Sequence, residues 1–539
     1  MKQNLNLWSV LVALLMTSVQ LSAQDTYVNE RITNTTDLIG TARYVGMGGA
    51  MGALGADISV MSSNPAGIGL FRRTTFAGTL SVLSQTDKQN RDESLTHFSF
   101  DNLGVVVSLP LDPDGMSQYF NFGVNYQKKA NYNHVLTANN ANTLGLSQTD
   151  QFAHLSNLWA YVDNKGYTNF PSRLIGTAYN AWLFDSDAQG YYSYGADRNA
   201  FTRVTSGGLH GVDINLSYNV LDRYFFGATF GVDDLDYESS TTYGESLMQQ
   251  NASGGWEDHG YRLHSTQNIS GNGINVKFGT IVRPFEDSPF RVGVAVETPT
   301  YYRLESTSFY TIESPFDANG DYTPNYMNRY RGEMDNYFDY KLTTPWKFRF
   351  SMGHTIGSYL ALGAEYEDAD YSTTKMSYPT YDYYWGDDYW SDSQKDTEMN
   401  RLTRRTLQGV HSLKLGMEMN LGAGISLRAG FNHHSKAFKK KAYLDQDIDS
   451  YAMTFATGTD YTNLGDVNLY TAGLGYRGEH FYVDVAYKYR AQGGKFYAFD
   501  DSFTQSADYE GTSLQGLKLA PVDVDLDHHQ VFLTLGYRL

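Results

Sequence analysis

The chain lacks cysteine altogether and contains little proline. None of its 539 residues is Cys and only 12 are Pro. The absence of cysteine excludes disulfides, thiolate catalysis and lipid attachment through a cysteine. No Pro-rich or Ser-rich linker divides the chain into separate soluble domains. Its stability must therefore come from one large closed fold.

Long hydrophobic runs are also missing beyond the first residues. A spanning helix needs about 18 or more consecutive apolar residues, and no segment after the N-terminal one approaches that length. The N-terminal segment has one early cation, Lys2, an apolar run that begins at Leu7, and a small-residue exit at Leu21-Ser22-Ala23. This pattern predicts a secretory signal peptide over residues 1–23, and hence export.

The formal net charge of -18 argues against nucleic acid as a partner. Enzyme signatures such as Gly-x-Ser-x-Gly and His-Glu-x-x-His are absent, and we expect no enzymatic activity. The Asp317–Asp321 segment and the alternating Asp445, Asp447 and Asp449 resemble calcium loops, but neither has the completing glutamate. We therefore predict no metal and no cofactor.

Alternating strand segments are what the chain has in abundance, together with 43 Tyr and 51 Gly. The last nine residues are the clearest case, because Val531, Leu533 and Leu535 fall on one face and Phe532 and Thr534 on the other. A strand has a side-chain period of two. In outer-membrane barrels, lipid-facing and lumen-facing residues alternate in this way.

Comparable segments recur along the whole chain, and their second faces are polar. Because a charge facing lipid at mid-membrane costs about 2–4 kcal/mol, these polar faces should line a lumen. The apolar faces include Phe120/Phe122/Val124, Val212/Ile214/Leu216, Phe348/Phe350/Met352, Leu413/Leu415/Met417 and Val483/Val485/Tyr487, and the opposite faces carry Asn121, Asp213, Lys277, Arg349, Lys414, Arg428 and Lys488.

Connections between these segments are short and long in turn. Six short ones lie near 112–115, 221–222, 286–289, 356–358, 422–424 and 478–479; seven long ones lie around 87–95, 130–206, 238–258, 313–336, 373–400, 439–463 and 500–527. This predicts an all-β transmembrane antiparallel barrel of about 14 strands over residues 73–539, with the short turns on the periplasmic side. A β-propeller is disfavoured because no fixed-length blade repeat is present.

Residues 24–72 precede the first strand and show no strand alternation. They are rich in Gly and Ala, including Gly46, Gly48 and Gly49, and they contain the rigid turn Asn64-Pro65-Ala66-Gly67. Small side chains let backbone pack closely in a confined space. We predict that this segment is an N-terminal periplasmic or lumenal hatch that plugs the barrel.

The hatch sequence resembles the FadL/OmpP1/TodX family of outer-membrane transporters for hydrophobic compounds. The resemblance rests on Gly46-Met47-Gly48-Gly49-Ala50, on Asp57, on Asn64-Pro65-Ala66-Gly67 and on the barrel that follows. It implies a monomer in the Gram-negative outer membrane that takes up long-chain fatty acids or aromatic compounds, with hatch movement and lateral exit beside a kinked strand. Asn64, Pro65 and Ala66 carry over as hatch contacts, whereas the ligand-lining residues do not. Implied partners are outer-membrane lipid, lipopolysaccharide and the barrel assembly machinery.

Several alternatives remain open. The plug could be a permanent seal, and the barrel could be a general porin or an adhesin-like surface or structural protein. Paired histidines, His433-His434 and His528-His529, suggest a haem-binding receptor, although adjacent strand residues point to opposite faces. The run Lys439-Lys440-Lys441 fits either contact with lipopolysaccharide phosphates or a solvated surface.

Overall fold

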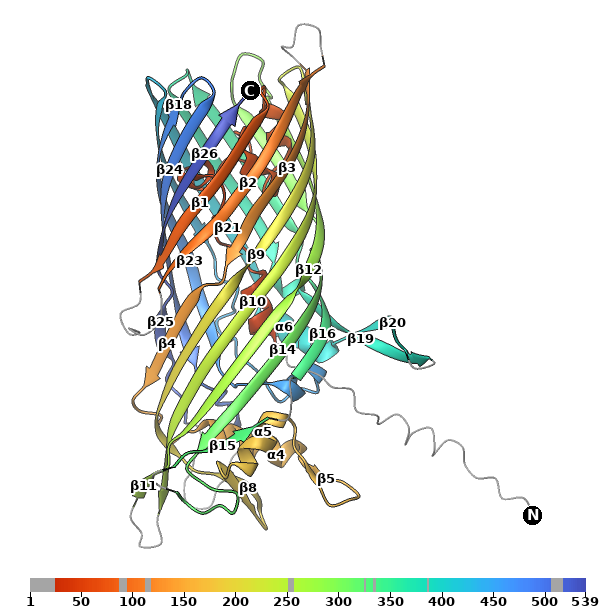
Figure 1. Ribbon diagram of the computed structural model, residues 1–539, viewed down its shortest axis with the longest axis vertical. Coiled ribbons are helices and arrows are strands. Elements are labelled where there is room, and N and C mark those ends of the chain that lie inside the picture. The colour runs from red at the N-terminus through yellow and green to blue at the C-terminus, as the bar shows by residue number, and fades with distance from the viewer. Residues whose placement is uncertain are drawn as a thin grey trace, which may run out of the picture.

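The computed structural model is a closed antiparallel β-barrel (Figure 1). It describes residues 25–86, 95–111, 118–250, 256–323, 326–332, 336–384, 387–505 and 517–539. The predicted signal peptide and the predicted turn at 112–115 lie outside these ranges. No helix in the described ranges is long and apolar enough to cross a membrane.

Fourteen strand positions make up the wall, as the alternation predicted. Nine are continuous: β1 (Thr75–Gln85), β2 (Thr96–Pro110), β9 (Ala196–Val220), β10 (Tyr224–Gln250), β12 (Tyr261–Val282), β21 (Gly409–Gly422), β22 (Ile425–His434), β23 (Tyr461–Arg477) and β24 (Phe481–Tyr497). Five are built from two segments each: β3 (Gln118–Asn131) with β4 (His134–Asn140), β13 (Arg291–Glu297) with β14 (Tyr301–Ser314), β16 (Asn336–Thr343) with β17 (Lys347–Ile356), β18 (Leu360–Asp370) with β19 (Lys375–Tyr384), and β25 (Val522–Asp525) with β26 (His528–Arg538). Pairing of β1 with β26, from Thr75↔Arg538 to Gln85↔His528, closes the cylinder.

The remaining elements lie inside the barrel or at its long-loop end. The N-terminal segment contains α2 (Thr26–Thr33), α3 (Ala42–Gly46) and the short helices η1 (Ile58–Ser62) and η2 (Pro65–Leu70). The long loops contain β5 (Tyr161–Val162), β6 (Thr168–Asn169), β7 (Phe184–Asp187), β8 (Gly190–Ser193), β11 (Trp256–Asp258), β15 (Asn328–Arg331), β20 (Asp387–Lys395), α4 (Gln148–Trp159), α5 (Arg173–Asn180), α6 (Thr397–Thr406), η3 (Tyr371–Thr373), η4 (Tyr451–Phe455) and η5 (Ser502–Gln505).

The two faces of each strand differ as the sequence predicted. On β26, Leu533 is 42% exposed and Leu535 59% exposed, whereas Thr534 is fully buried. Elsewhere in the wall, charged side chains such as Lys277 and Lys488 point inward and are buried. Large apolar side chains outside and buried charges inside are the reverse of a water-soluble protein and are expected of a barrel that spans a membrane.

Aromatic and histidine side chains mark the edge of the apolar band near the long-loop end. Tyr126 bonds to His210 Nδ1 at 2.7 Å, and His411 lies beside Tyr366, whose hydroxyl is 2.9 Å from its Nδ1. Tyr487 is paired in the same way with His529, at 2.6 Å. Tyrosine, whose ring joins an apolar body to one polar hydroxyl, favours a membrane–water boundary. We call this set the outer girdle.

The described short turns lie together at the end of the barrel that also holds the C-terminus (Figure 1). Between the paired Val220 and Tyr224, Leu221 and Asp222 both have left-handed φ, 55° and 51°, as a type I′ turn requires. The prediction of a loop at 238–258 is largely wrong, because β10 and β12 stay paired out to Glu245↔Tyr261. Inward apolar residues there, including Tyr243 and Leu247, pack into a core with α4 and α5, which extends the wall.

The register of β26 allows a direct test. We expect Leu533→Arg to reduce the yield of folded barrel severely, because an arginine facing mid-membrane lipid costs about 2–4 kcal/mol. Leu533→Phe, at the same position, should fold normally. Heat-modifiable mobility on gels measures the folded fraction. Equal folding of both variants would contradict the assigned face. Thr534, on the lumenal face of β26, is not a suitable control position for Leu533, because its Oγ1 accepts a 2.7 Å bond from Ala42 N of the N-terminal segment.

Candidate functional site

The N-terminal segment Asp25–Phe71 lies inside the cylinder, where the hatch was predicted (Figure 1). Its first element, α2, begins after Asp25, whose carboxylate accepts bonds from Tyr27 N (2.7 Å) and Val28 N (2.9 Å). The helix packs against α6, where Thr26 Oγ1 and Thr403 Oγ1 are 2.8 Å apart. We call residues 25–71 the plug.

The turn Asn64-Pro65-Ala66-Gly67 is fixed to the wall through backbone groups. Asn64 Oδ1 accepts from Ala66 N at 3.2 Å, and its Nδ2 donates to Gly52 O (2.9 Å) and to Thr280 O of β12 (3.4 Å). Pro65 O accepts from Ser217 Oγ of β9 at 2.8 Å. The Asn64 amide nitrogen therefore bonds to carbonyl groups of the plug and of β12.

A row of wall glycines receives the plug. Gly353, Gly363, Gly416 and Gly430 stand directly opposite one another on β17, β18, β21 and β22. A Cβ on Gly363 would overlap the Ala50 carbonyl, and one on Gly416 would overlap that of Met47; a Cβ on Gly430 or Gly227 would likewise meet plug backbone, at Gly48 and Pro65. Only glycine lets plug backbone approach the strands this closely. We call this row the glycine seat.

The predicted hatch glycines lie on the plug side of this contact. Gly48 and Gly49 have left-handed φ of 60° and 70°, which L side chains rarely adopt. A Cβ on Gly48 would stand 2.8 Å from Leu415 O, and Gly46 lies against Gly473 of β23. Gly46 and Gly48 thus have a steric role in docking the plug, whereas a Cβ on Gly49 would meet Leu38 and Tyr44 within the plug itself. The sequence indicated these glycines only as small-residue content.

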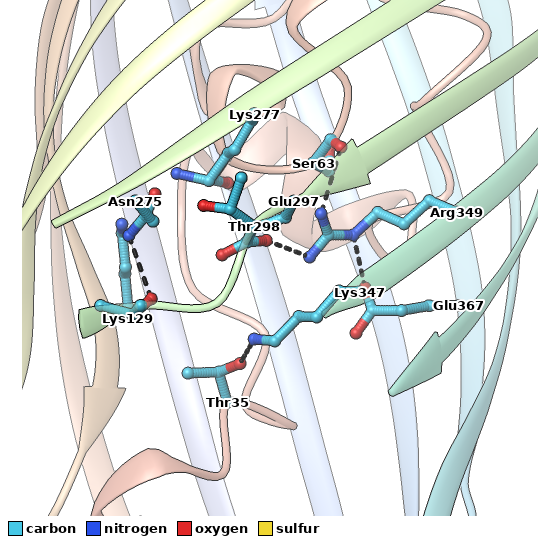
Figure 2. A network of polar contacts seen from close by, with 12 residues as sticks. Thr35, Ser63, Lys129, Asn275, Lys277, Glu297, Thr298, Lys347, Arg349 and Glu367 are labelled. Carbon is cyan, nitrogen blue, oxygen red and sulfur yellow. Dashed lines mark hydrogen bonds and ion pairs between the residues drawn. The ribbon is translucent and has the colours of Figure 1, made fainter. Parts of the chain in front are cut away.

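Buried charges of the wall hold the middle of the plug (Figure 2). Arg349 forms ion pairs with Glu297 (2.8 Å) and Glu367 (2.6 Å) and donates to Ser63 O of the plug (3.4 Å). Beside it, Lys347 donates to Thr35 Oγ1 at 2.6 Å. These groups line a cavity of about 100 Å³, which we call the charged cavity.

Two plug charges are paired with the wall as well. Arg43 meets Glu418 at 2.9 Å, and Glu418 also pairs with Arg428 at 2.6 Å. Asp37 meets the fully buried Lys488 at 2.5 Å. Burial opposes ionisation of Asp37, but the Lys488 ammonium together with the nearby His528 and Arg490 outweighs it and holds the pKa of Asp37 below its ordinary value.

Three further cavities adjoin one another from the long-loop end inward. The outer cavity, about 140 Å³, lies between α4, α5 and residues 446–456, and it shares Met453 and Ala456 with a cavity of about 60 Å³ beside α2. This helix cavity shares Tyr27, Arg31 and Arg203 with the wall cavity, which measures about 130 Å³. The α2 helix therefore borders two of these neighbouring cavities.

The wall cavity lies at a break in the third strand position. Between β3 and β4, Tyr132 and Asn133 leave the strand, and both line the cavity. Within the described residues, the ladder between β2 and β3 stops at Asn102↔Gln127. Beyond it the Gln85 side chain bridges to β4, with its Nε2 2.6 Å from Val135 O and its Oε1 2.8 Å from Val135 N. One side chain here replaces strand pairing.

The polar atoms left unpaired in the wall cavity include nitrogen atoms of two side chains. His528 is 5% exposed and both its ring nitrogens lack a hydrogen-bond partner in the described structure, as does Arg490 Nε. By contrast, Glu30 and Asp37 already accept bonds, from Asn34 and Lys488. Apolar walls come from Tyr27, Leu83, Leu136, Phe438, Leu464 and Leu526. The sequence had marked His528 only as part of a histidine pair.

The other candidate groups of the sequence are dispersed. His434 points inward to Ser412 Oγ (2.7 Å), while His433 bonds to Asn468 Oδ1 (2.9 Å). His529 belongs to the outer girdle, so each pair divides between the two faces, as strand geometry predicted. Asp317 forms its own turn by accepting from Asn319 N and Asp321 N. The described residues contain no cluster of metal-ligating groups.

Comparison with known proteins returns solved structures of low sequence identity. No family model and no curated protein matches the chain. A FadL homologue from Pseudomonas aeruginosa is 11% identical, with 93% of this chain and 98% of that chain covered and a TM-score of 0.46. The toluene transporter TodX from P. putida is 12% identical, with 93% and 99% covered and a TM-score of 0.45. The CymD monoaromatic hydrocarbon channel is 10% identical, with 93% and 97% covered and a TM-score of 0.45. Two of these structures, the FadL homologue and TodX, carry names of the family that the plug sequence resembles.

Proposed function

We propose that this protein is an outer-membrane channel for passive uptake of hydrophobic small molecules. The observation that carries the proposal is the series of adjoining cavities. It begins beneath the long loops, passes α2 and ends at the break between β3 and β4, while the glycine seat closes the short-turn end. In this orientation the long loops face outward and the short turns face the periplasm. Export by the signal peptide, insertion by the barrel assembly machinery and a monomeric state belong to the same proposal.

The exit in this proposal is lateral. Strand pairing in the barrel wall is interrupted beside the wall cavity, and the Gln85 side chain bridges this gap. A molecule in the cavity would leave the barrel through this gap. A direct path to the periplasm would require removal of Ala50, Met47 and their neighbours from the glycine seat. We infer that residues 40–71 stay in place and that Asn64–Gly67 act as a fixed anchor. The movable part is then α2.

The wall cavity favours a hydrophobic molecule with an acidic head over a neutral hydrocarbon. Its apolar side chains would surround a chain or ring, and the unpaired nitrogens of Arg490 and His528 would meet a carboxylate. A general porin fits less well, because the plug is packed against the wall on many strands. Adhesion and haem binding have no observation in the described residues that favours them.

A reversible lock on α2 tests the proposal. Because the chain has no native cysteine, Thr26→Cys/Thr403→Cys introduces one pair where the two side-chain oxygens are 2.8 Å apart. Oxidation should slow oleate uptake by cells at least tenfold, and a reductant should restore it. The unlocked protein should take up toluene more slowly than oleate.

The matched control is Ser84→Cys/Thr96→Cys, which joins β1 to β2 at an oxygen separation of 3.2 Å and leaves α2 free. Oxidation of this pair should leave oleate uptake unchanged. If the oxidised α2 lock transports oleate as fast as the same variant after reduction, α2 is not the movable part and the proposed route past it is wrong.

A further inference from the structure

A concentration of positive charge stands out on the exterior of this acidic protein. Arg401 and Arg404 lie on the exposed face of α6, and Lys436, Lys439, Lys440 and Lys441 lie on the exposed segment that follows β22. The two elements are joined, since Lys439 N donates to Thr406 O at 2.9 Å and Lys439 Nζ to Arg404 O at 2.6 Å. We call these six side chains the basic patch.

Most of this charge is not neutralised within the protein. Lumenal cations such as Lys277 and Lys414 have carboxylate partners at 3.0 Å and 2.9 Å. In the patch, Arg401 stands 3.6 Å from Glu398 and both are solvent-accessible. For Arg404, Lys436, Lys440 and Lys441, no side-chain ion pair occurs among the described residues. Four free cations in a chain of net charge -18 constitute a local site for anions.

The patch lies next to the outer edge of the lipid-facing band. Ser435, which precedes Lys436, donates from its backbone N to His411 O at 2.9 Å, and His411 belongs to the outer girdle. In Figure 1, α6 stands beside β16 at the side of the barrel, where the β19–β20 hairpin leaves the wall. This is the level at which lipid head groups meet a spanning barrel.

An apolar groove lies on the outside of the same strands. It encloses about 560 Å³ on the outer surface of β17, β18, β21 and β22, and its lining includes Met352, Ala364, Leu415, Ala429 and Phe431. Leu415 follows His411 on β21 by four residues, or about 13 Å of strand. An acyl chain whose head group lies at the patch is long enough to reach the groove.

We propose that the basic patch and the groove together bind a phosphorylated lipid of the outer leaflet, of the lipopolysaccharide type. Its phosphates would contact the free cations of α6 and the lysine run, and an acyl chain would fill the groove between Ala364 and Ala429. Lysine and arginine suit phosphate through charge-assisted hydrogen bonds. The proposal is independent of the uptake route and shares with it only the outer-membrane orientation.

The test measures binding of diphosphorylated lipid A to the full-length barrel in detergent by native mass spectrometry. The variant Arg404→Gln/Lys440→Gln/Lys441→Gln should bind at least tenfold more weakly. Ala429→Phe, which fills the groove, should weaken binding several-fold. Monophosphorylated lipid A should bind the unmodified barrel more weakly than the diphosphorylated form.

The matched control is Lys165→Gln/Arg198→Gln/Lys495→Gln, which removes three exposed cations elsewhere at the long-loop end, one between β5 and β6 and two on β9 and β24. It should keep the affinity of the unmodified barrel. The proposal would be overturned if the patch variant bound diphosphorylated lipid A as tightly as the unmodified barrel does. It would also be overturned if the patch and control variants lost affinity equally, or if the unmodified barrel bound both lipids equally well. Folding is checked by heat-modifiable mobility, and oleate uptake by the patch variant should be unchanged, which separates this site from the uptake route.

Discussion

Replacing Gly363 with valine should open the barrel to small polar solutes. Any Cβ at this position overlaps the Ala50 carbonyl, and the valine methyl groups extend the overlap. Overpacking typically costs about 1–3 kcal/mol and forces the weaker partner to move. The wall strand is held by ladders on both sides, so the plug should leave its seat. Liposome swelling with a small sugar should show a rate at least tenfold above that of the unmodified barrel.

The matched control for this variant is Gly78→Val on β1. A Cβ at Gly78 is no nearer than 3.5 Å to the next atom, so valine fits there and suits a strand. Both variants should migrate as folded barrels on gels. A Gly363→Val barrel that is folded and as impermeable as Gly78→Val would show that the glycine seat does not provide the seal.

Removing the lysine that holds Asp37 should release the first third of the plug. Lys488 is fully buried, 2.5 Å from Asp37 and 3.0 Å from Leu38 O. Breaking a buried ion pair by deleting one partner costs about 3–5 kcal/mol, because a charge is left without compensation. We therefore expect Lys488→Met to lose amide exchange protection over residues 26–39, as measured by hydrogen–deuterium exchange.

A second substitution distinguishes electrostatics from packing. Lys488→Met/Asp37→Leu removes both charges and should recover most of the protection, since an apolar pair of similar volume is often as stable as the ion pair it replaces. Lys495→Met, which breaks the exposed pair with Asp523, should have little effect. If the double variant exchanges as fast as Lys488→Met, the ion pair is not what holds this part of the plug.

The sequence predicted those parts of the fold that follow from local periodicity. The outward face of Leu533 and the inward face of Lys277 follow from alternation combined with the high cost of a charge in lipid. The position of the plug was also predictable, because a Gly-rich segment without alternation cannot form a wall strand. Turn chemistry at Leu221-Asp222 located a hairpin correctly.

The parts that could not be predicted depend on contacts between distant segments. The α2 helix is buried through partners such as Thr403 and Asn463, which are more than 370 residues away. Strand pairing continues into the expected loop after Glu238 because Tyr243 and Tyr261 share a core with α4, which local pattern does not reveal. The break at Tyr132 and Asn133 has no Gly or Pro to mark it. Alternation assigned Arg349 to the lumen, but its partners Glu297 and Glu367 come from other strands.

The bond between Thr534 and the plug has a consequence for the order of assembly. Thr534 Oγ1 lies 2.7 Å from Thr79 Oγ1 of the first strand and also accepts from Ala42 N. The last strand therefore meets the first strand and the plug at one residue. A nascent barrel that closed while empty would bury Thr534 without its plug partner. We therefore expect the N-terminal segment to dock before the cylinder shuts, and slow or misplaced docking of the plug to delay closure itself.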